Sequence, residues 1–89
     1  MYFEWDEFKN TLNIIKHHVS FEKARDAFSD PGLILVEDEK HSGKEKRFFA
    51  LGVVDGEVLT VRYTKRGEII RIFGAGYWRR GTQRYYEEQ

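Results

Sequence analysis

The 89-residue chain contains no cysteine, a single proline and no excess charge of either sign, because 15 Lys and Arg balance 15 Asp and Glu. Without cysteine it has no disulfide framework, no thiolate nucleophile and no cysteine-ligated zinc. Its three histidines, His17, His18 and His41, are too few and too scattered to indicate a metal site. No apolar run approaches the roughly 20 residues that a membrane helix requires, and we expect no signal peptide. These absences favour a cytoplasmic protein with one domain over residues 1–89.

The charges are distributed unevenly along the chain. Residues 1–61 carry 8 Lys and Arg against 12 Asp and Glu, whereas residues 62–84 carry 7 against Glu68 alone. Such a basic third can focus positive potential locally although the net charge is zero, and it favours an anionic partner. The alternative is that these arginines are solvated or paired with the acidic part of the chain.

The first 18 residues predict a short strand and a helix. Tyr2-Phe3-Glu4 suits a strand, and Asp6 can cap a helix that runs to His17 or His18. One face of this helix is polar and cationic, which suits a phosphate-bearing partner, and it collects Lys9, Asn13, Lys16 and His17. Another face is apolar, we expect it to be buried, and it collects Phe8, Leu12, Ile15 and Val19.

The remainder of the chain predicts a second helix, four strands and a last helix. Ser20 can cap a helix over Phe21–Phe28, which Pro31-Gly32 ends. The expected later elements are strands at Leu33–Val36, Arg47–Val54, Glu57–Thr64 and Glu68–Phe73 and a helix at Thr82–Glu88. The fold class is therefore α+β. We expect an antiparallel sheet, made of a three-strand meander plus one or two further strands, with two N-terminal helices packed on one face and a short C-terminal helix.

The turns predict the register of the meander. Asp55-Gly56 is a strong hairpin signal, and Lys65-Arg66-Gly67 predicts a three-residue turn. This pairing places Arg71 opposite Val61, as the single charge on an apolar sheet face. An arginine there keeps its proton and must either pair or bind an anion. We expect Arg71 to be a phosphate clamp in a shallow trough or, alternatively, a partner in an internal salt bridge to an acidic residue of a helix.

The order of these features resembles the BrnT family of toxins from bacterial type II toxin–antitoxin systems. Four blocks carry the resemblance: Phe3-Glu4-Trp5-Asp6 with Lys9, Asn13 and Lys16-His17; Val19-Ser20-Phe21-Glu22 with Ala24, Phe28, Asp30 and Pro31; Asp38, His41-Ser42, Glu45 and Arg47-Phe48; and Val61, Tyr63-Thr64, Arg66-Gly67, Ile69-Ile70-Arg71-Ile72, Ala75 and Tyr86-Glu87. The family usually has a serine-alanine-arginine run after the last strand, where this chain has Gly74-Ala75-Gly76. Arg79 or Arg80 would have to reach back to replace that arginine.

The resemblance implies a RelE-like fold and a small endoribonuclease that uses neither metal nor cofactor, cuts RNA and thereby inhibits translation. It also implies neutralisation by a cognate antitoxin, a BrnA-like DNA-binding protein, in a toxin–antitoxin hetero-oligomer that represses its own operon. The alternative is a non-catalytic RelE-like module that only binds antitoxin, operator or RNA.

Metal-free RNA cleavage requires a base for the 2′-hydroxyl, cations for the phosphate and an acid for the leaving oxygen. We expect His17 to serve ahead of His41, which is otherwise a solvated loop residue, with Arg71 and Lys9 as the cations. The expected RNA contacts are Trp5, Arg47, Trp78, Arg79 and Arg80, because aromatic and arginine side chains stack on unpaired bases. The alternatives are that Trp5 is a core ring and that the segment 77–80 docks the antitoxin.

Overall fold

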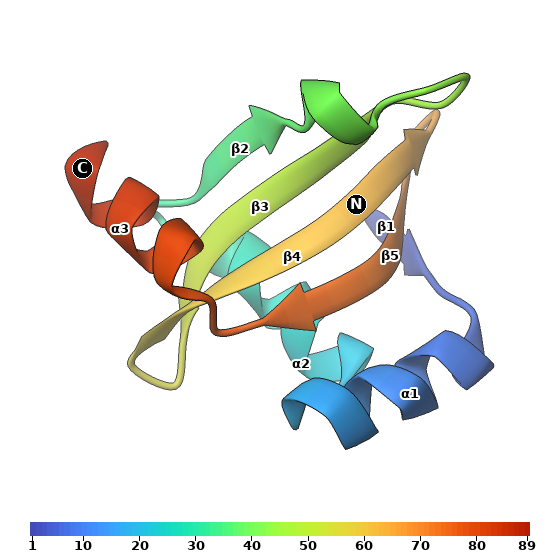
Figure 1. Cartoon of the computed structure of the whole chain (residues 1–89), viewed down its shortest axis with the longest axis horizontal. Coiled ribbons are helices and arrows are strands. Elements are labelled where there is room, and N and C mark those ends of the chain that lie inside the picture. The colour runs from blue at the N-terminus through green and yellow to red at the C-terminus, as the bar shows by residue number, and fades with distance from the viewer.

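A computed structural model describes all of residues 1–89. Its five strands form one sheet in the order β1-β5-β4-β3-β2, and α3 crosses the opposite face from α2 (Figure 1). The elements in chain order are β1 (Tyr2–Glu4), α1 (Glu7–His17), α2 (Phe21–Arg25), the 3₁₀ turn η1 (Asp26–Ser29), β2 (Ile34–Glu37), the 3₁₀ turn η2 (Glu39–His41), β3 (Arg47–Val54), β4 (Glu57–Arg66), β5 (Ile69–Gly76) and α3 (Arg79–Glu87). The predicted α+β class is confirmed. None of the helices has the length and apolar character that crossing a membrane requires.

The prediction of a wholly antiparallel sheet is wrong at one edge. β1 pairs with β5 in parallel, with Tyr2 opposite Ile69 and Glu4 opposite Arg71. β1 and β5 are far apart in the chain, so no tight hairpin forces them to run in opposite directions. The other three strand pairs are antiparallel.

The predicted register of β5 is also wrong. β4 continues to Arg66, which pairs with Ile69 across a two-residue turn with Gly67 at φ 61°. Arg71 therefore lies opposite Thr64, three residues from its predicted partner Val61. Because side chains alternate along a strand, this odd shift moves Arg71 to the other face of the sheet.

Local sequence signals position the first two helices. The Asp6 carboxylate accepts hydrogen bonds from the backbone N–H groups of Phe8 and Lys9, and the Ser20 hydroxyl accepts one from Lys23. Both N-caps agree with the sequence prediction. The second helix is shorter than predicted, because it tightens into η1 where its backbone packs on β3. A Cβ atom at Gly52 would lie 2.2 Å from the carbonyl oxygen of Ala27, so only glycine permits this approach.

Two apolar clusters cover the two faces of the sheet. The larger one joins α2 and η1 to the inward side chains of β3, β4 and β5. Its fully buried members include Phe21 of α2 and Leu59 and Tyr63 of β4. The smaller one places Tyr85 of α3 against Leu51 and Val58. The sheet is thus the central layer, and α3 covers only part of its second face.

The prediction for the buried face of α1 is wrong. Phe8, Leu12 and Ile15 are 72%, 37% and 66% exposed, whereas Asn10 and Asn13 are only 5% and 7% exposed. The helix docks through these two amides because each satisfies buried backbone groups. The Asn10 side-chain oxygen accepts from the N–H of Phe21, at 2.8 Å, in the first turn of α2. Only Val19, which follows the helix, is buried as expected.

Asn13 completes the free edge of β5. Its side-chain oxygen accepts from the N–H of Ala75 at 3.2 Å, and its Nδ2 donates to the carbonyl oxygens of Ala75, at 3.0 Å, and Val19, at 2.9 Å. β1 pairs with β5 only as far as Arg71. At Ala75, four residues beyond the last β1 pair, the Asn13 amide therefore does what an edge strand would do.

Replacing Asn13 by alanine should lower the free energy of unfolding by about 1–3 kcal/mol or more, because it leaves buried N–H and C=O groups without partners. Urea denaturation followed by circular dichroism measures this loss. Thr11→Ala, at an exposed position of the same helix, is the matched control and should change the value by less than about 0.5 kcal/mol. Equal midpoints for Asn13→Ala and the wild type would show that the amide does not hold α1.

α3 is attached to the sheet by a second polar contact. The Tyr85 hydroxyl donates to Asp30 Oδ2 at 2.5 Å, and the same carboxylate accepts from the N–H groups of Val53, at 2.8 Å, and Gly32, at 2.9 Å. The hydrogen bond from Tyr85, with those from the two backbone groups, lowers the pKa of Asp30. The same hydrogen bond raises the pKa of Tyr85 to about 12, because the hydroxyl must keep its proton to donate it to Asp30.

These shifts predict how the contact depends on pH. A lowered carboxyl pKa stabilises the fold above the unfolded value of about 3.9, and that contribution is lost as the pH falls through the folded value. A raised tyrosine pKa stabilises the fold below the unfolded value of about 10, and that contribution is lost as the pH rises through the folded value. Tyr85→Phe should therefore be less stable than the wild type at neutral pH, with the difference shrinking at both extremes. Denaturation curves across the pH range test this, with the exposed Tyr86→Phe as control; a pH-independent difference would contradict it.

Candidate active site

The sheet face that carries α3 is uncovered along the second half of β4 and the adjoining parts of β3 and β5 (Figure 1). Register places Arg47, Thr64 and Arg71 side by side on three neighbouring strands there. The same face carries Arg62 and Phe73 further along. Arginines from three strands are thus gathered on one open surface.

A hollow of about 300 Å³ lies at this end of the sheet, and we call it the cationic hollow. Its lining residues are Lys9, His41, Gly43, Lys44, Glu45, Arg47, Thr64, Arg66, Arg71 and Phe73. Five of these side chains are cationic and Glu45 alone is acidic. The concentration of positive charge suits a polyanion.

Two of the five cations are neutralised by carboxylates. Arg66 Nε donates to Glu45 Oε2 at 3.0 Å, and Arg71 Nη1 donates to Glu4 Oε2 at 2.5 Å. Lys9, Lys44 and Arg47 have no carboxylate within 4.0 Å. These three side chains are the free positive charges of the cationic hollow.

The predicted apolar trough around Arg71 is wrong. The shifted register places Arg71 beside Thr64 on the polar face, and parallel pairing places it beside Glu4. An internal salt bridge, the alternative expected for this arginine, is present, but its partner belongs to β1 and not to a helix. Both side chains remain about a third exposed, so the pair can still be reached from solvent.

His41 lies at the rim of the cationic hollow on a loop that hydrogen bonds hold in place. Its Nδ1 is 2.9 Å from Asp38 Oδ2, an arrangement that orients the ring and leaves Nε2 free. The Ser42 hydroxyl donates to the carbonyl of Asp38 and accepts from the N–H of Arg47. The loop is thereby anchored to the start of β3. An imidazole oriented by a carboxylate beside unpaired cations can carry a proton to or from a bound phosphodiester.

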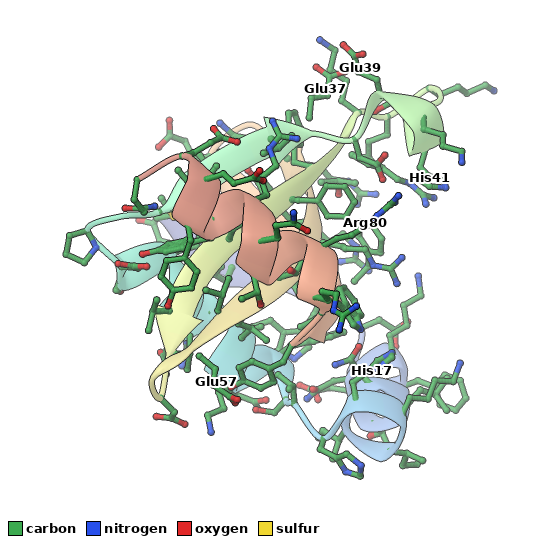
Figure 2. All side chains as sticks on the ribbon, turned by 60° about the vertical axis from the view of Figure 1, so that its left-hand side comes forward. His17, Glu37, Glu39, His41, Glu57 and Arg80 are labelled. Carbon is green, nitrogen blue, oxygen red and sulfur yellow. The ribbon has the colours of Figure 1, made fainter.

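His17 lies outside the cationic hollow. Its half-buried ring makes an edge-to-face contact with Trp78, with centroids 5.3 Å apart. The predicted convergence of His17 and Arg71 on one anionic pocket therefore does not occur. In Figure 2 His41, Arg80 and His17 follow one another down the same side of the molecule, with His41 and His17 at the two ends.

A row of stacked cations and rings connects Trp78 to the cationic hollow. Arg62 Cζ lies 5.6 Å from the centroid of Trp78 and 5.4 Å from that of Phe73. Arg47 Cζ lies 5.1 Å from the same Phe73 centroid. We call Arg47, Phe73, Arg62 and Trp78 the stacked row.

The remaining predicted residues occupy three other places. Trp5 packs edge-on against Phe21, and its Nε1 donates to Glu7 Oε2 at 3.0 Å, so it belongs to the margin of the core. Trp78 and Arg80 line a larger hollow of about 660 Å³ beneath α3. Arg79 lines a third hollow together with Tyr77 and Glu57, beside the β3–β4 hairpin.

Four of the residues predicted from the sequence line the cationic hollow: Lys9, His41, Arg47 and Arg71. The sequence analysis did not propose Asp38 as a site residue, although Asp38 precedes His41 by three residues and this spacing is a usable signal. It also missed Lys44, Arg62, Arg66 and Phe73 as site residues, because their convergence depends on the register of β4 and β5. No group of three or more histidine or acidic side chains is placed to hold a metal ion.

The fold and the cationic hollow define an α+β protein with a positively charged sheet face. The family model described as "Ribonuclease toxin, BrnT, of type II toxin-antitoxin system" matches residues 5–81, and the chain belongs to this family. A search of curated proteins finds no match. Membership in a type II toxin–antitoxin family implies an antitoxin partner.

Proposed function

We propose that this protein is a metal-independent endoribonuclease toxin with a RelE-like fold, which cuts cytoplasmic RNA in the cationic hollow and so inhibits translation. The observation that carries the proposal is the placement of the Asp38–His41 pair beside the unpaired Lys9, Lys44 and Arg47. Membership in a family of ribonuclease toxins supports the same activity.

The proposed reaction uses the 2′-hydroxyl of RNA as nucleophile. His41 Nε2 takes its proton, the 2′-oxygen bonds to phosphorus, and the bond to the 5′-oxygen breaks, which leaves a 2′,3′-cyclic phosphate. Lys9 and Arg47 stabilise the added negative charge on the phosphate, and Arg71 donates to it from the N–H groups that Glu4 does not use. Lys44 or Lys9 supplies the proton that the leaving oxygen takes up. DNA lacks the nucleophile and should not be cut.

This assignment gives the proton transfer to His41 instead of His17. His41 shares the cationic hollow with the phosphate-binding cations, whereas His17 contacts Trp78 outside it. Base stacking is assigned to the arginine–aromatic pairs of the stacked row, because Trp5 is packed against the core.

The purified protein should cleave single-stranded RNA in the presence of a metal chelator and leave DNA of the same sequence intact. His41→Gln and Arg47→Ala should each lower the cleavage rate by about 10²-fold. The first removes the proton acceptor and the second removes a phosphate contact. His18→Asn is the control, since this exposed imidazole lies outside the hollow and asparagine tolerates its φ of 60°. Gel analysis of labelled RNA measures the rates.

Retention of RNA without cleavage would contradict the catalytic proposal and favour the non-catalytic binding module. Cleavage that survives both substitutions would place the reaction elsewhere on the molecule. Loss of activity in His18→Asn as well would show that the substitutions act through folding.

We further propose that the antitoxin, a BrnA-like DNA-binding protein, forms the hetero-oligomer by packing on the apolar stripe of α1, made of Phe8, Leu12 and Ile15. The stripe points away from the body of the molecule, because the opposite side of the helix carries the buried Asn10 and Asn13. Lys9 and Lys16 flank it on one side, so two copies of this chain packed antiparallel would bring like charges together. A partner helix with carboxylates on that flank fits better.

Replacing Phe8 and Ile15 together by serine should weaken antitoxin binding at least tenfold, because burial of each side chain contributes about 1.5–3 kcal/mol. The partner to use is the protein encoded by the neighbouring reading frame, and titration calorimetry measures the affinity. The control is Leu35→Ser, an exposed apolar residue of β2. Unchanged affinity in the double variant, or an equal loss in the control, would rule out this docking surface.

A further inference from the structure

Arg62 differs from the other arginines that extend from β4 and β5 on this face. Arg66 and Arg71 each contact a carboxylate, whereas Arg62 has none within 4.0 Å and lies over two aromatic rings instead. Stacking on rings holds a guanidinium in place without neutralising its charge. Its N–H groups, which lie in the guanidinium plane, then stay available to an oxyanion.

Two glycines of β5 make room for this arrangement. A Cβ atom at Gly74 would lie 2.7 Å from Nε of Arg62, and one at Gly76 would lie 2.4 Å from Cε2 of Trp78. The pairing of β4 with β5 also shifts register between Arg62 and Tyr63, which places Arg62 opposite Gly74. The guanidinium and the indole therefore lie directly on the backbone of β5, where any larger residue would displace them.

The stacked row continues the cationic hollow instead of forming a separate patch. Arg47 lines the hollow and shares the ring of Phe73 with Arg62. The distance between the two guanidinium carbons is therefore at most the sum of their distances to the centroid of Phe73. The two guanidinium groups therefore share one aromatic support, and neighbouring phosphates of a single strand can each meet one of them.

We propose that Arg62, supported by Phe73 and Trp78, is a second phosphate subsite that binds the phosphate next to the one in the cationic hollow. The ligand class is single-stranded RNA of at least two consecutive phosphates. This inference rests on the proposed function, because it extends the same RNA-binding surface. Arg62 is here a binding residue for the strand and takes no part in the proton transfers.

Salt dependence of binding separates a phosphate contact from a structural role. The logarithm of the binding constant for single strands falls with the logarithm of salt concentration with a slope of about −0.7 for each neutralised phosphate. The probe is a 2′-O-methyl RNA oligonucleotide, which binds but lacks the nucleophile and is not cut. Arg62→Gln should reduce the magnitude of the slope by about 0.7, and Arg62→Lys should retain most of it.

The matched control is Arg25→Gln, which removes the same charge from an exposed position on α2 that is remote from the stacked row. It should leave the slope unchanged. With cleavable RNA, Arg62→Gln should raise KM more than it lowers kcat. Circular dichroism of each variant confirms that the fold is retained.

Three outcomes would overturn the inference. A slope in Arg62→Gln equal to that of the wild type, with weaker binding at every salt concentration, would show that Arg62 only supports Trp78. Equal slope and equal affinity would show that RNA does not reach Arg62, although RNA binding by the hollow would stand. Failure of the wild-type protein to bind the oligonucleotide would remove the proposed function together with the subsite.

Discussion

The side-chain amide of Asn13 makes the contact on which the position of α1 against the sheet depends. It pairs with both backbone polar groups of Ala75 and also reaches the carbonyl of Val19. β1 covers β5 only over Ile69–Arg71, so without this amide the next part of β5 would be an unpaired edge. The contact fixes the rotation of α1 about its own axis. It therefore decides that Phe8 and Ile15 face solvent, that Lys9 reaches the cationic hollow and that His17 meets Trp78.

Concentrating arginines and lysines on one face carries an electrostatic cost, and the molecule limits it without removing the positive field. Glu4 and Glu45 neutralise Arg71 and Arg66, the two arginines nearest the turn between β4 and β5. Arg47 and Arg62 are held by aromatic contacts, which orient a guanidinium but leave its charge intact. The result is a surface with a few fixed positive groups at defined places, which is the property that a strand of RNA with evenly spaced phosphates can use.

The glycines at the end of β5 decide which residue supplies the positive charge on that part of the sheet face. At Gly76 the indole of Trp78 occupies the space that a side chain would take, so the cation on this part of the face comes from Arg62 on the neighbouring strand. Lys9 belongs both to the hollow and to the flank of the apolar stripe. An antitoxin bound to α1, as proposed, would thus lie at the rim of the cationic hollow.

The sequence alone determined the features that depend on neighbouring residues. Asp6 and Ser20 start their helices and Asp55-Gly56 closes its hairpin, because the groups that satisfy each backbone N–H or permit each φ lie within a few residues. Four of the residues that it proposed for the site, His41 and Arg47 among them, line the cationic hollow in the structure. Only the tertiary structure decided the face of Arg71, the outward stripe of α1, the parallel β1 and the position of His17. Those depend on a two-residue turn and on an amide whose partner, Ala75, is 62 positions away in the chain, and no local pattern encodes a contact at that distance.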